Sequence, residues 1–133
     1  MKATTKVFVY GTLKEGRPLD RKAFAERRTN VDEATIVGSI FSLGRYPTIK
    51  LDGEGVVHGE VHTFRSDDFA AVLMSMDAIE GYNPSKPEAG LYTRHLLDVT
   101  TKSGEVVKAW TYEYNGSVKA DRRLKDGVWE PGK

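Results

Sequence analysis

The sequence contains no cysteine among its 133 residues. This absence excludes a disulfide framework, a thiolate zinc site, an iron–sulfur cluster and a cysteine nucleophile. Long hydrophobic runs are lacking as well, because the apolar stretch over residues 7–10 is too short for the core of a signal sequence or for a membrane span. We therefore expect a cytoplasmic protein without a membrane partner.

Charge of one sign is not in excess, since 20 Lys and Arg balance 19 Asp and Glu for a net charge of +1. Such a chain has no overall field that attracts nucleic acid, and we expect no nucleic-acid partner. The hydrophobic fraction of 39%, together with 13 glycines, is close to that of globular chains. The length suits one domain, which we expect to span residues 1–133.

One long helix is predicted in the middle of the chain. Ser66 is a candidate N-cap, and Gly81 suits the position just after the end of a helix. Apolar residues recur between them at spacings of three and four, which predicts a face packed on a core. These residues are Phe69, Val72, Leu73, Met76 and Ile79.

Short segments rich in β-branched and aromatic residues, separated by turn residues, predict a series of strands. The strands are expected at residues 7–10, 34–43, 47–51, 55–64, 92–101 and 106–114, and a short second helix at 19–28. Strands in this number with one strong helix predict an α+β fold, in which a small mixed β-barrel carries one main helix.

Tyr10-Gly11-Thr12-Leu13 stands where the first predicted strand ends. Glycine permits close approach of a ligand to the backbone, and successive N–H groups at such a turn can hold a carboxylate without a cationic side chain. An ordinary strand-to-loop turn is the alternative. The loop lacks the glycine spacing of nucleotide-phosphate sites.

Glu80 falls in the last turn of the predicted helix, directly before Gly81. A carboxylate there faces the negative end of the helix dipole, and partial burial would disfavour its charge a second time. We therefore expect the pKa of Glu80 to be raised, which suits a group that takes and returns protons. A solvated glutamate at a helix end is the alternative.

His58, Glu60 and His62 alternate along a predicted strand, which places all three on one face. Their nitrogen and oxygen donors can bind a metal, as in a cupin-like metalloenzyme, although such a site usually needs a further ligand. The alternative places the three side chains on a polar, solvent-facing side, with Val57, Val61 and Thr63 facing inward.

Tyr92 and Arg94 likewise share one face of a predicted strand. Arg94 can pair with a carboxylate, and Tyr92 can donate a hydrogen bond to a substrate or to Glu80. A solvated edge strand is the alternative.

Short motifs follow one another from the first strand to the end of the chain. In order, they are Val7-Phe8-Val9-Tyr10-Gly11-Thr12-Leu13, Gly44-Arg45-Tyr46-Pro47, Val57-His58-Gly59-Glu60-Val61, Met76-Asp77-Ala78-Ile79-Glu80-Gly81-Tyr82, Tyr92-Thr93-Arg94, Ala109-Trp110-Thr111-Tyr112 and Asp126-Gly127-Val128-Trp129. Together they resemble the γ-glutamylcyclotransferase-like family, in particular its AIG2-like and γ-glutamylamine cyclotransferase branch. The most specific feature is the pair of Tyr-Gly-Thr-Leu and Glu-Gly-Tyr at this separation.

The resemblance implies a mixed α/β barrel with Glu80 as general acid and base, and with no metal or other cofactor required. The loop Tyr10-Gly11-Thr12-Leu13 would hold the α-carboxylate of a small-molecule γ-glutamyl substrate. Further substrate-binding positions are expected around the site: Tyr46, Tyr92, Arg94 and Tyr112.

The implied reaction converts a γ-glutamyl amine or peptide to 5-oxoproline and a free amine. Because the α-amine attacks the side-chain carbonyl of its own molecule, no enzyme nucleophile is needed, which agrees with the absence of cysteine. Two alternatives stay open, a metal-dependent cupin-like enzyme and a non-catalytic binding module of the same fold. Residues 83–90 form a loop long enough to be a lid.

Overall fold

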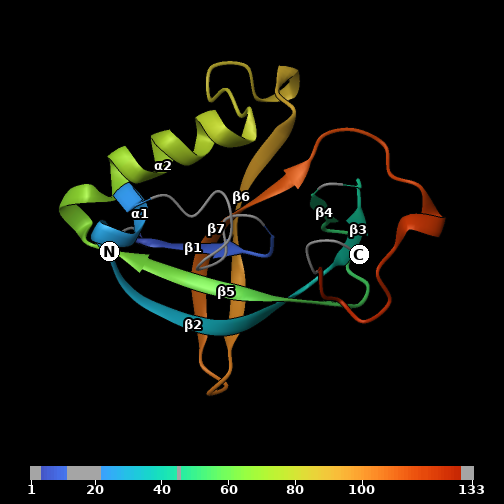
Figure 1. Ribbon diagram of the computed structural model, residues 1–133, viewed down its shortest axis with the longest axis horizontal. Helices are drawn as coiled ribbons and strands as arrows, with labels where there is room; N and C mark the ends of the chain where they lie inside the picture. Colours follow the sequence, from blue (N-terminus) through green and yellow to red (C-terminus); the bar gives the residue numbers. More distant parts are fainter. Residues whose placement is uncertain (1–3, 12–21, 45, 130–133) are drawn as a thin grey trace.

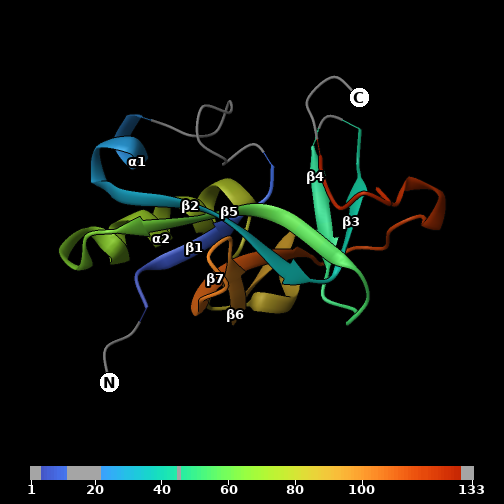
Figure 2. The same cartoon turned by 90° about the horizontal axis from the view of Figure 1, so that it is seen from below.

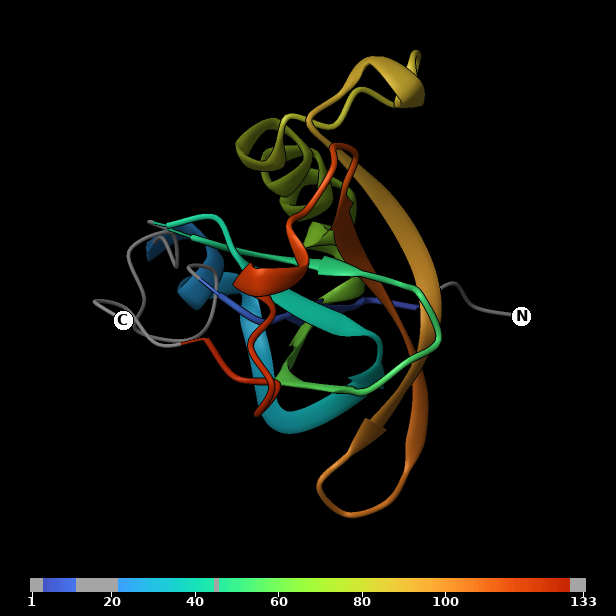
Figure 3. The ribbon, with the colours of Figure 1, turned by 90° about the vertical axis from the view of Figure 1, so that its right-hand side faces the viewer.

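A closed barrel forms the body of the protein (Figures 1 and 3). The computed structural model describes residues 4–11, 22–44 and 46–129. In barrel order, the strands are β1 (Lys6–Val9), β5 (Val56–Phe64), β2 (Arg28–Val37), β6 (Tyr92–Thr101) and β7 (Val106–Tyr114). Neighbours run antiparallel except β1 and β7, which close the barrel as a parallel pair at Val7 and Trp110. The predicted α+β fold with a small mixed barrel is confirmed.

The strand predicted at residues 34–43 is two strands in the structure. β2 already begins at Arg28, and the chain bends at Gly38 before β3 (Ser39–Ser42). The polar start of β2 joins the strand because antiparallel pairing with β5 is made by backbone groups and does not require apolar side chains. At Gly38 a Cβ would lie 2.9 Å from the carbonyl oxygen of Lys50, so the bend favours glycine.

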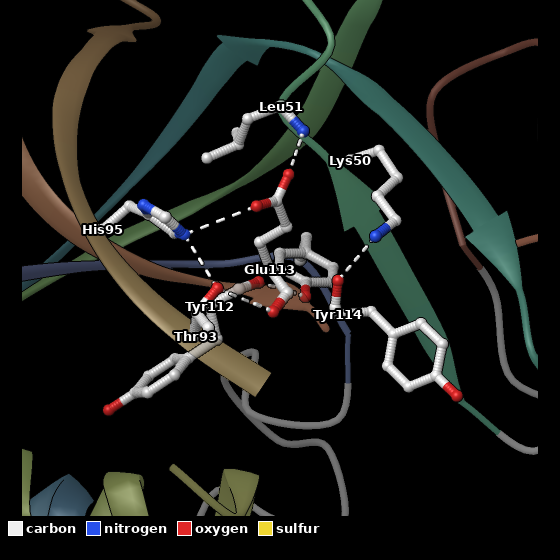
Figure 4. Close-up of polar contacts among 8 residues, drawn as sticks. Lys50, Leu51, Thr93, His95, Tyr112, Glu113 and Tyr114 are labelled. Atoms are coloured by element: carbon white, nitrogen blue, oxygen red, sulfur yellow. Dashed lines mark hydrogen bonds and ion pairs between the residues drawn. The ribbon is translucent and has the colours of Figure 1, made fainter. Parts of the chain in front are cut away.

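β3 and β4 (Pro47–Lys50) form a separate two-stranded sheet beside the barrel (Figure 2). Side chains and backbone fasten the end of β4 to the β6–β7 hairpin (Figure 4). The backbone N–H of Leu51 donates to Glu113 Oε2 at 2.7 Å, and Lys50 Nζ donates to the carbonyl oxygen of Tyr114 at 2.7 Å. These bonds fix where the residues of β4 lie relative to the barrel.

The main helix, α2 (Ser66–Glu80), lies along the outside of the barrel near β1 (Figure 1). The N-cap predicted at Ser66 is wrong. Arg65 is the extended capping residue, and its carbonyl accepts the N–H of Asp68 at 3.0 Å, which makes Ser66 the first helical residue. Gly81 ends the helix at φ 67°, as predicted. The buried residues of the helix are Phe69, Val72, Met76 and Asp77.

Alternate residues of β1 face two different hydrophobic clusters. Phe8 and Tyr10 belong to the cluster inside the barrel, whereas Val7 and Val9 belong to a second cluster between the barrel and the helices. The second cluster includes Phe69, Val72 and Met76 of α2, with Leu73 and Ile79 packed against it at partial burial. The apolar face predicted for the helix is therefore confirmed.

A short helix, α1 (Lys22–Arg27), adds Phe24 to the cluster between barrel and helices. It is the described part of the helix predicted at residues 19–28, whose first residues lie outside the described ranges. None of the helices in the described part of the chain combines the length and the apolar character that a bilayer crossing requires.

Candidate functional site

Glu80 is the last residue of α2 and is partly buried. Its charge acts on Tyr10, which follows β1, and on Tyr92, the first residue of β6. Burial disfavours the charged form of its carboxyl group and raises the pKa of Glu80 from 4.5 to about 7. The raised pKa predicted from the sequence is confirmed, and its physical cause is burial. A carboxyl group with this pKa is present in both protonation states near neutral pH.

Three tyrosines lie close enough to this carboxyl group to feel its charge. Tyr10 follows β1, Tyr92 begins β6 and Tyr112 lies in β7, and all three are buried. Burial raises the pKa of each phenol well above 10, and the negative charge of Glu80 adds to the effect. The three tyrosines therefore stay protonated and neutral at the pH where Glu80 titrates.

The end of β1 is pressed against β4. A Cβ at Gly11 would lie 2.5 Å from Cγ of Pro47, so only glycine allows the backbone to approach this closely. The hydroxyl of Tyr10 donates to the carbonyl oxygen of Tyr112 at 2.7 Å and ties the same turn to β7. Thr12 and Leu13, the other half of the predicted carboxylate-binding loop, lie outside the described residues.

Arg94 reaches a carboxylate of the protein itself. Its guanidinium donates to Asp77 Oδ2 at 2.7 Å, and the hydroxyl of Tyr112 donates to Asp77 Oδ1 at 2.6 Å. The rings of Tyr82 and Trp110 flank the guanidinium, with its carbon 5.1 and 4.8 Å from their centroids. The structure thus places Arg94 in a network that joins α2, β6 and β7.

Asp77 and Thr48 are two residues of this region that the sequence analysis does not single out. Asp77 is an acid three residues before Glu80, on the same helical face, and that spacing is the signal that points to it. Thr48 follows the Tyr46-Pro47 motif and is fully buried on β4, facing the phenols of Tyr10 and Tyr92. Its burial depends on tertiary packing, so no sequence signal identifies it.

Tyr46 lies at the rim of the site with 42% of its surface exposed. It is close enough to Tyr92 to contribute to the raised pKa of that phenol.

His58, Glu60 and His62 do not converge on one point. The side chain of His58 is exposed, whereas His62 is buried, with Nε2 2.9 Å from Glu60 Oε1 and Nδ1 3.5 Å from a guanidinium nitrogen of Arg28. Among the described residues, no three His, Asp or Glu side chains are grouped as metal ligands would be. The alternative of a fully solvent-facing side is also wrong, because His62 is buried and its ring lies 6.5 Å from that of Phe64, a member of the second hydrophobic cluster.

The loop over residues 83–90, predicted as a candidate lid, is attached to the end of β7. The side-chain amide of Asn115 donates to the carbonyl oxygens of Glu88 and Gly90, each at 2.9 Å. The backbone N–H of Asn115 donates to the carbonyl oxygen of Leu91 at 2.9 Å. A short 3-10 helix, η1 (Pro87–Ala89), lies within the loop.

A second polar cluster joins β6, β7 and the end of β4 (Figure 4). His95 Nε2 is 2.8 Å from Thr93 Oγ1 and 3.4 Å from Glu113 Oε1, and Glu113 also accepts the bond from Leu51. This cluster holds β4 against the hairpin.

Comparison with known proteins connects this geometry to a family. The model of the family described as "Gamma-glutamyl cyclotransferase, AIG2-like" matches residues 7–131. No curated protein matches the sequence significantly.

Solved structures share the fold. Protein ytfP from Escherichia coli is 29% identical, with a TM-score of 0.61 over 93% of this chain and 95% of that one. An AIG2-like protein from Mus musculus is 17% identical, with a TM-score of 0.65 over 97% and 90%. YkqA from Bacillus subtilis is 23% identical, with a TM-score of 0.67; the match covers 96% of this chain but 40% of YkqA.

Proposed function

Because the chain belongs to the γ-glutamyl cyclotransferase, AIG2-like family, we propose that it converts a γ-glutamyl amine or γ-glutamyl peptide to 5-oxoproline and a free amine. The observation that carries this proposal is the Glu80 carboxyl group, whose pKa of about 7 arises from burial among three neutral tyrosines. Such a group can accept and return a proton under the same conditions.

The reaction needs proton transfer and positioning. Glu80 as carboxylate takes a proton from the α-ammonium group of the substrate, and the freed amine attacks the γ-carbonyl carbon. A five-membered ring forms as the new C–N bond is made. The second proton of the attacking nitrogen and the proton held by Glu80 pass to the leaving nitrogen, the amide C–N bond breaks, and the products are 5-oxoproline and an ammonium ion.

The end of β1 supports the positioning half of this proposal. The backbone from Tyr10 to Gly11 lies against Pro47 beside the tyrosine cluster, and we assign the loop Tyr10-Gly11-Thr12-Leu13 to the α-carboxylate of the substrate. We assign Tyr92 to a hydrogen bond with the γ-glutamyl head, and Tyr46, which is 42% exposed at the rim, to contact with the leaving amine. Holding amine and carbonyl together replaces a bimolecular encounter, which can provide an effective molarity on the order of 10⁵ M.

Arg94 and Tyr112 support the site indirectly in this proposal. Both are bonded to Asp77, and Tyr112 also accepts the hydroxyl of Tyr10 through its carbonyl oxygen. We assign them to positioning of β6, β7 and Tyr10 around the substrate.

The first prediction is that Glu80→Gln abolishes release of 5-oxoproline. Glutamine fills the same space but neither takes nor returns a proton, and loss of a general acid and base lowers turnover by about 10²–10⁴-fold. The measurement is 5-oxoproline released from γ-glutamyl-ε-lysine, glutathione and a γ-glutamyl alkylamide, with circular dichroism to confirm folding.

The matched control is Glu88→Gln, which makes the same chemical change at an exposed glutamate in the neighbouring loop. This variant keeps wild-type turnover. Undiminished turnover in Glu80→Gln would contradict the assignment of the general acid and base. A wild-type protein that binds these compounds without releasing 5-oxoproline would be a binding module of the same fold.

A further inference from the structure

The loop over residues 83–90 belongs to the segment that joins Glu80, at the end of α2, to Tyr92, at the start of β6 (Figure 1). Its residues from Asn83 to Ala89 are exposed, and η1 within it has no buried residue. A segment that buries little apolar surface opens easily unless polar contacts hold it. The contacts that fasten this loop therefore decide how firmly the two site residues are held.

Asn115, directly after β7, provides the fastening. Its side-chain amide donates to the backbone carbonyl oxygens of Glu88 and Gly90, each at 2.9 Å, which uses both protons of the amide nitrogen. The backbone N–H of Asn115 donates to the carbonyl oxygen of Leu91 at 2.9 Å. One residue thus holds the whole end of the loop.

The held end of the loop in turn contacts the end of α2. The N–H of Leu91 donates to the carbonyl oxygen of Gly81 at 3.0 Å. A Cβ at Gly90 would lie 2.6 Å from the same oxygen, so the two stretches of backbone touch. Because Gly81 directly follows Glu80, a continuous series of contacts leads from Asn115 to the carboxyl group that the proposed reaction uses.

We infer that Asn115 is a positioning residue: by fastening the loop against Gly81, it keeps Glu80 and Tyr92 in place relative to each other. This inference rests on the proposed function and adds a residue that contacts neither the substrate nor Glu80. The loop, in this arrangement, is a fixed connection between two site residues. Its attachment matters for turnover because proton transfer depends on the position of the carboxyl group.

Loss of the attachment changes the solvation of Glu80. Burial is the cause of its raised pKa of about 7, so water that enters beside an opened loop moves this pKa toward 4.5. The charge of Glu80 acts on three phenols that stay protonated, and its helical face carries one ion pair: Tyr10, Tyr92 and Tyr112, and Asp77 with Arg94. The titration midpoint of Glu80 therefore reports directly on its burial.

Replacement of Asn115 by alanine tests this role, because alanine removes both side-chain donors and leaves the backbone bond to Leu91. We expect kcat to fall by up to about 10²-fold, as displacement of a catalytic group can cost this much. The midpoint of Glu80, measured by NMR of its carboxyl carbon, should move below the wild-type value, and the N–H of Leu91 should exchange faster with solvent. Asn115→Gln keeps the donors on a longer side chain and should recover part of kcat.

The matched control is Asn30→Ala, which removes another exposed asparagine side chain with a hydrogen bond, donated to Asp32 at 2.7 Å. This variant should keep the wild-type kcat and the wild-type midpoint of Glu80. The melting temperature of Asn115→Ala should stay close to that of the wild type, because the loop it releases is exposed.

The results separate this inference from the proposed function. If the wild type releases 5-oxoproline and Asn115→Ala has an unchanged Glu80 midpoint, the positioning role is overturned and the proposed function stands. A fall in kcat that only follows a fall in melting temperature indicates general destabilisation and also overturns the role. A wild type that releases no 5-oxoproline overturns the proposed function and this role together, before any variant is compared.

Discussion

At the scale of a single residue, burial of the Glu80 carboxyl group makes the stability of the fold depend on pH. Its pKa is about 7 in the folded protein and 4.5 as the reference for the unfolded chain. Between these values the folded state binds more protons than the unfolded state, so the free energy of unfolding falls as pH rises. The destabilisation of the folded state by this buried charge is absent below pH 4.5, grows up to about pH 7 and is complete above it.

Removing the charge should therefore stabilise the fold at high pH. The shift from 4.5 to about 7 corresponds to at most about 3.5 kcal/mol at roughly 1.4 kcal/mol per pKa unit. We expect Glu80→Gln to raise the melting temperature at pH 8 and to match the wild type near pH 4.5. Thermal unfolding of both proteins across this range measures the difference. A gain in stability that is the same at all pH values would contradict burial of the charge as its cause.

At the scale of secondary-structure elements, the pair of Asp77 and Arg94 joins α2 to β6. The nitrogen–oxygen distance is 2.7 Å, and the side chains are 9% and 17% exposed. Asp77→Asn leaves a largely buried guanidinium without its counter-charge, which typically destabilises a protein by about 3–5 kcal/mol. Urea unfolding of Asp77→Asn, Arg94→Met and the double variant measures their coupling. Additive single effects would contradict this role of the pair.

The same hairpin offers a control for this prediction. Lys108 and Asp98 form an ion pair at the identical distance of 2.7 Å, but their side chains are 62% and 64% exposed. Solvent screening limits such pairs to about 0–1 kcal/mol, so Asp98→Asn should change stability little. Comparing the two substitutions separates the effect of burial from the effect of distance.

At the scale of the whole molecule, Gly59 allows the barrel to close. A Cβ at this position would clash with the carbonyl oxygen of Val9 and lie 2.7 Å from Cζ of Phe8. Gly59→Ala must therefore push β1 away from β5, and we expect it to destabilise the protein by about 3 kcal/mol or more. Denaturant unfolding tests this, with Gly53→Asn as the control, since Gly53 has open space around it and asparagine tolerates its turn conformation.

Periodicity and turn chemistry predict much of this architecture. The spacing of Phe69, Val72 and Met76 defines the buried face of α2, and the β6–β7 hairpin follows from two apolar strands around a polar turn. The bend at Gly38 is not predicted, because it depends on the approach of Lys50, a residue distant in sequence. Backbone pairing with a partner strand likewise extends β2 beyond its apolar residues.

The candidate site is predictable to a similar degree. Position in the helix is enough to single out Glu80 and the direction of its pKa shift. The partner of Arg94 cannot be predicted in this way, because a pattern along one strand shows which residues share a face but not which residues of other elements that face contacts. Thr48 is missed for the same reason, since only the tertiary structure buries its hydroxyl.

The parallel pair of β1 and β7 brings together the two ends of the barrel sequence, and this has a consequence for folding. The bond from Tyr10 to Tyr112 spans 102 residues, and contacts of such separation form slowly because a long loop must close first. On the ribosome, the site would remain unassembled until β7 has been synthesised. A nascent chain that stops before β7 has the helix and Glu80 but not the strand that completes the barrel around them.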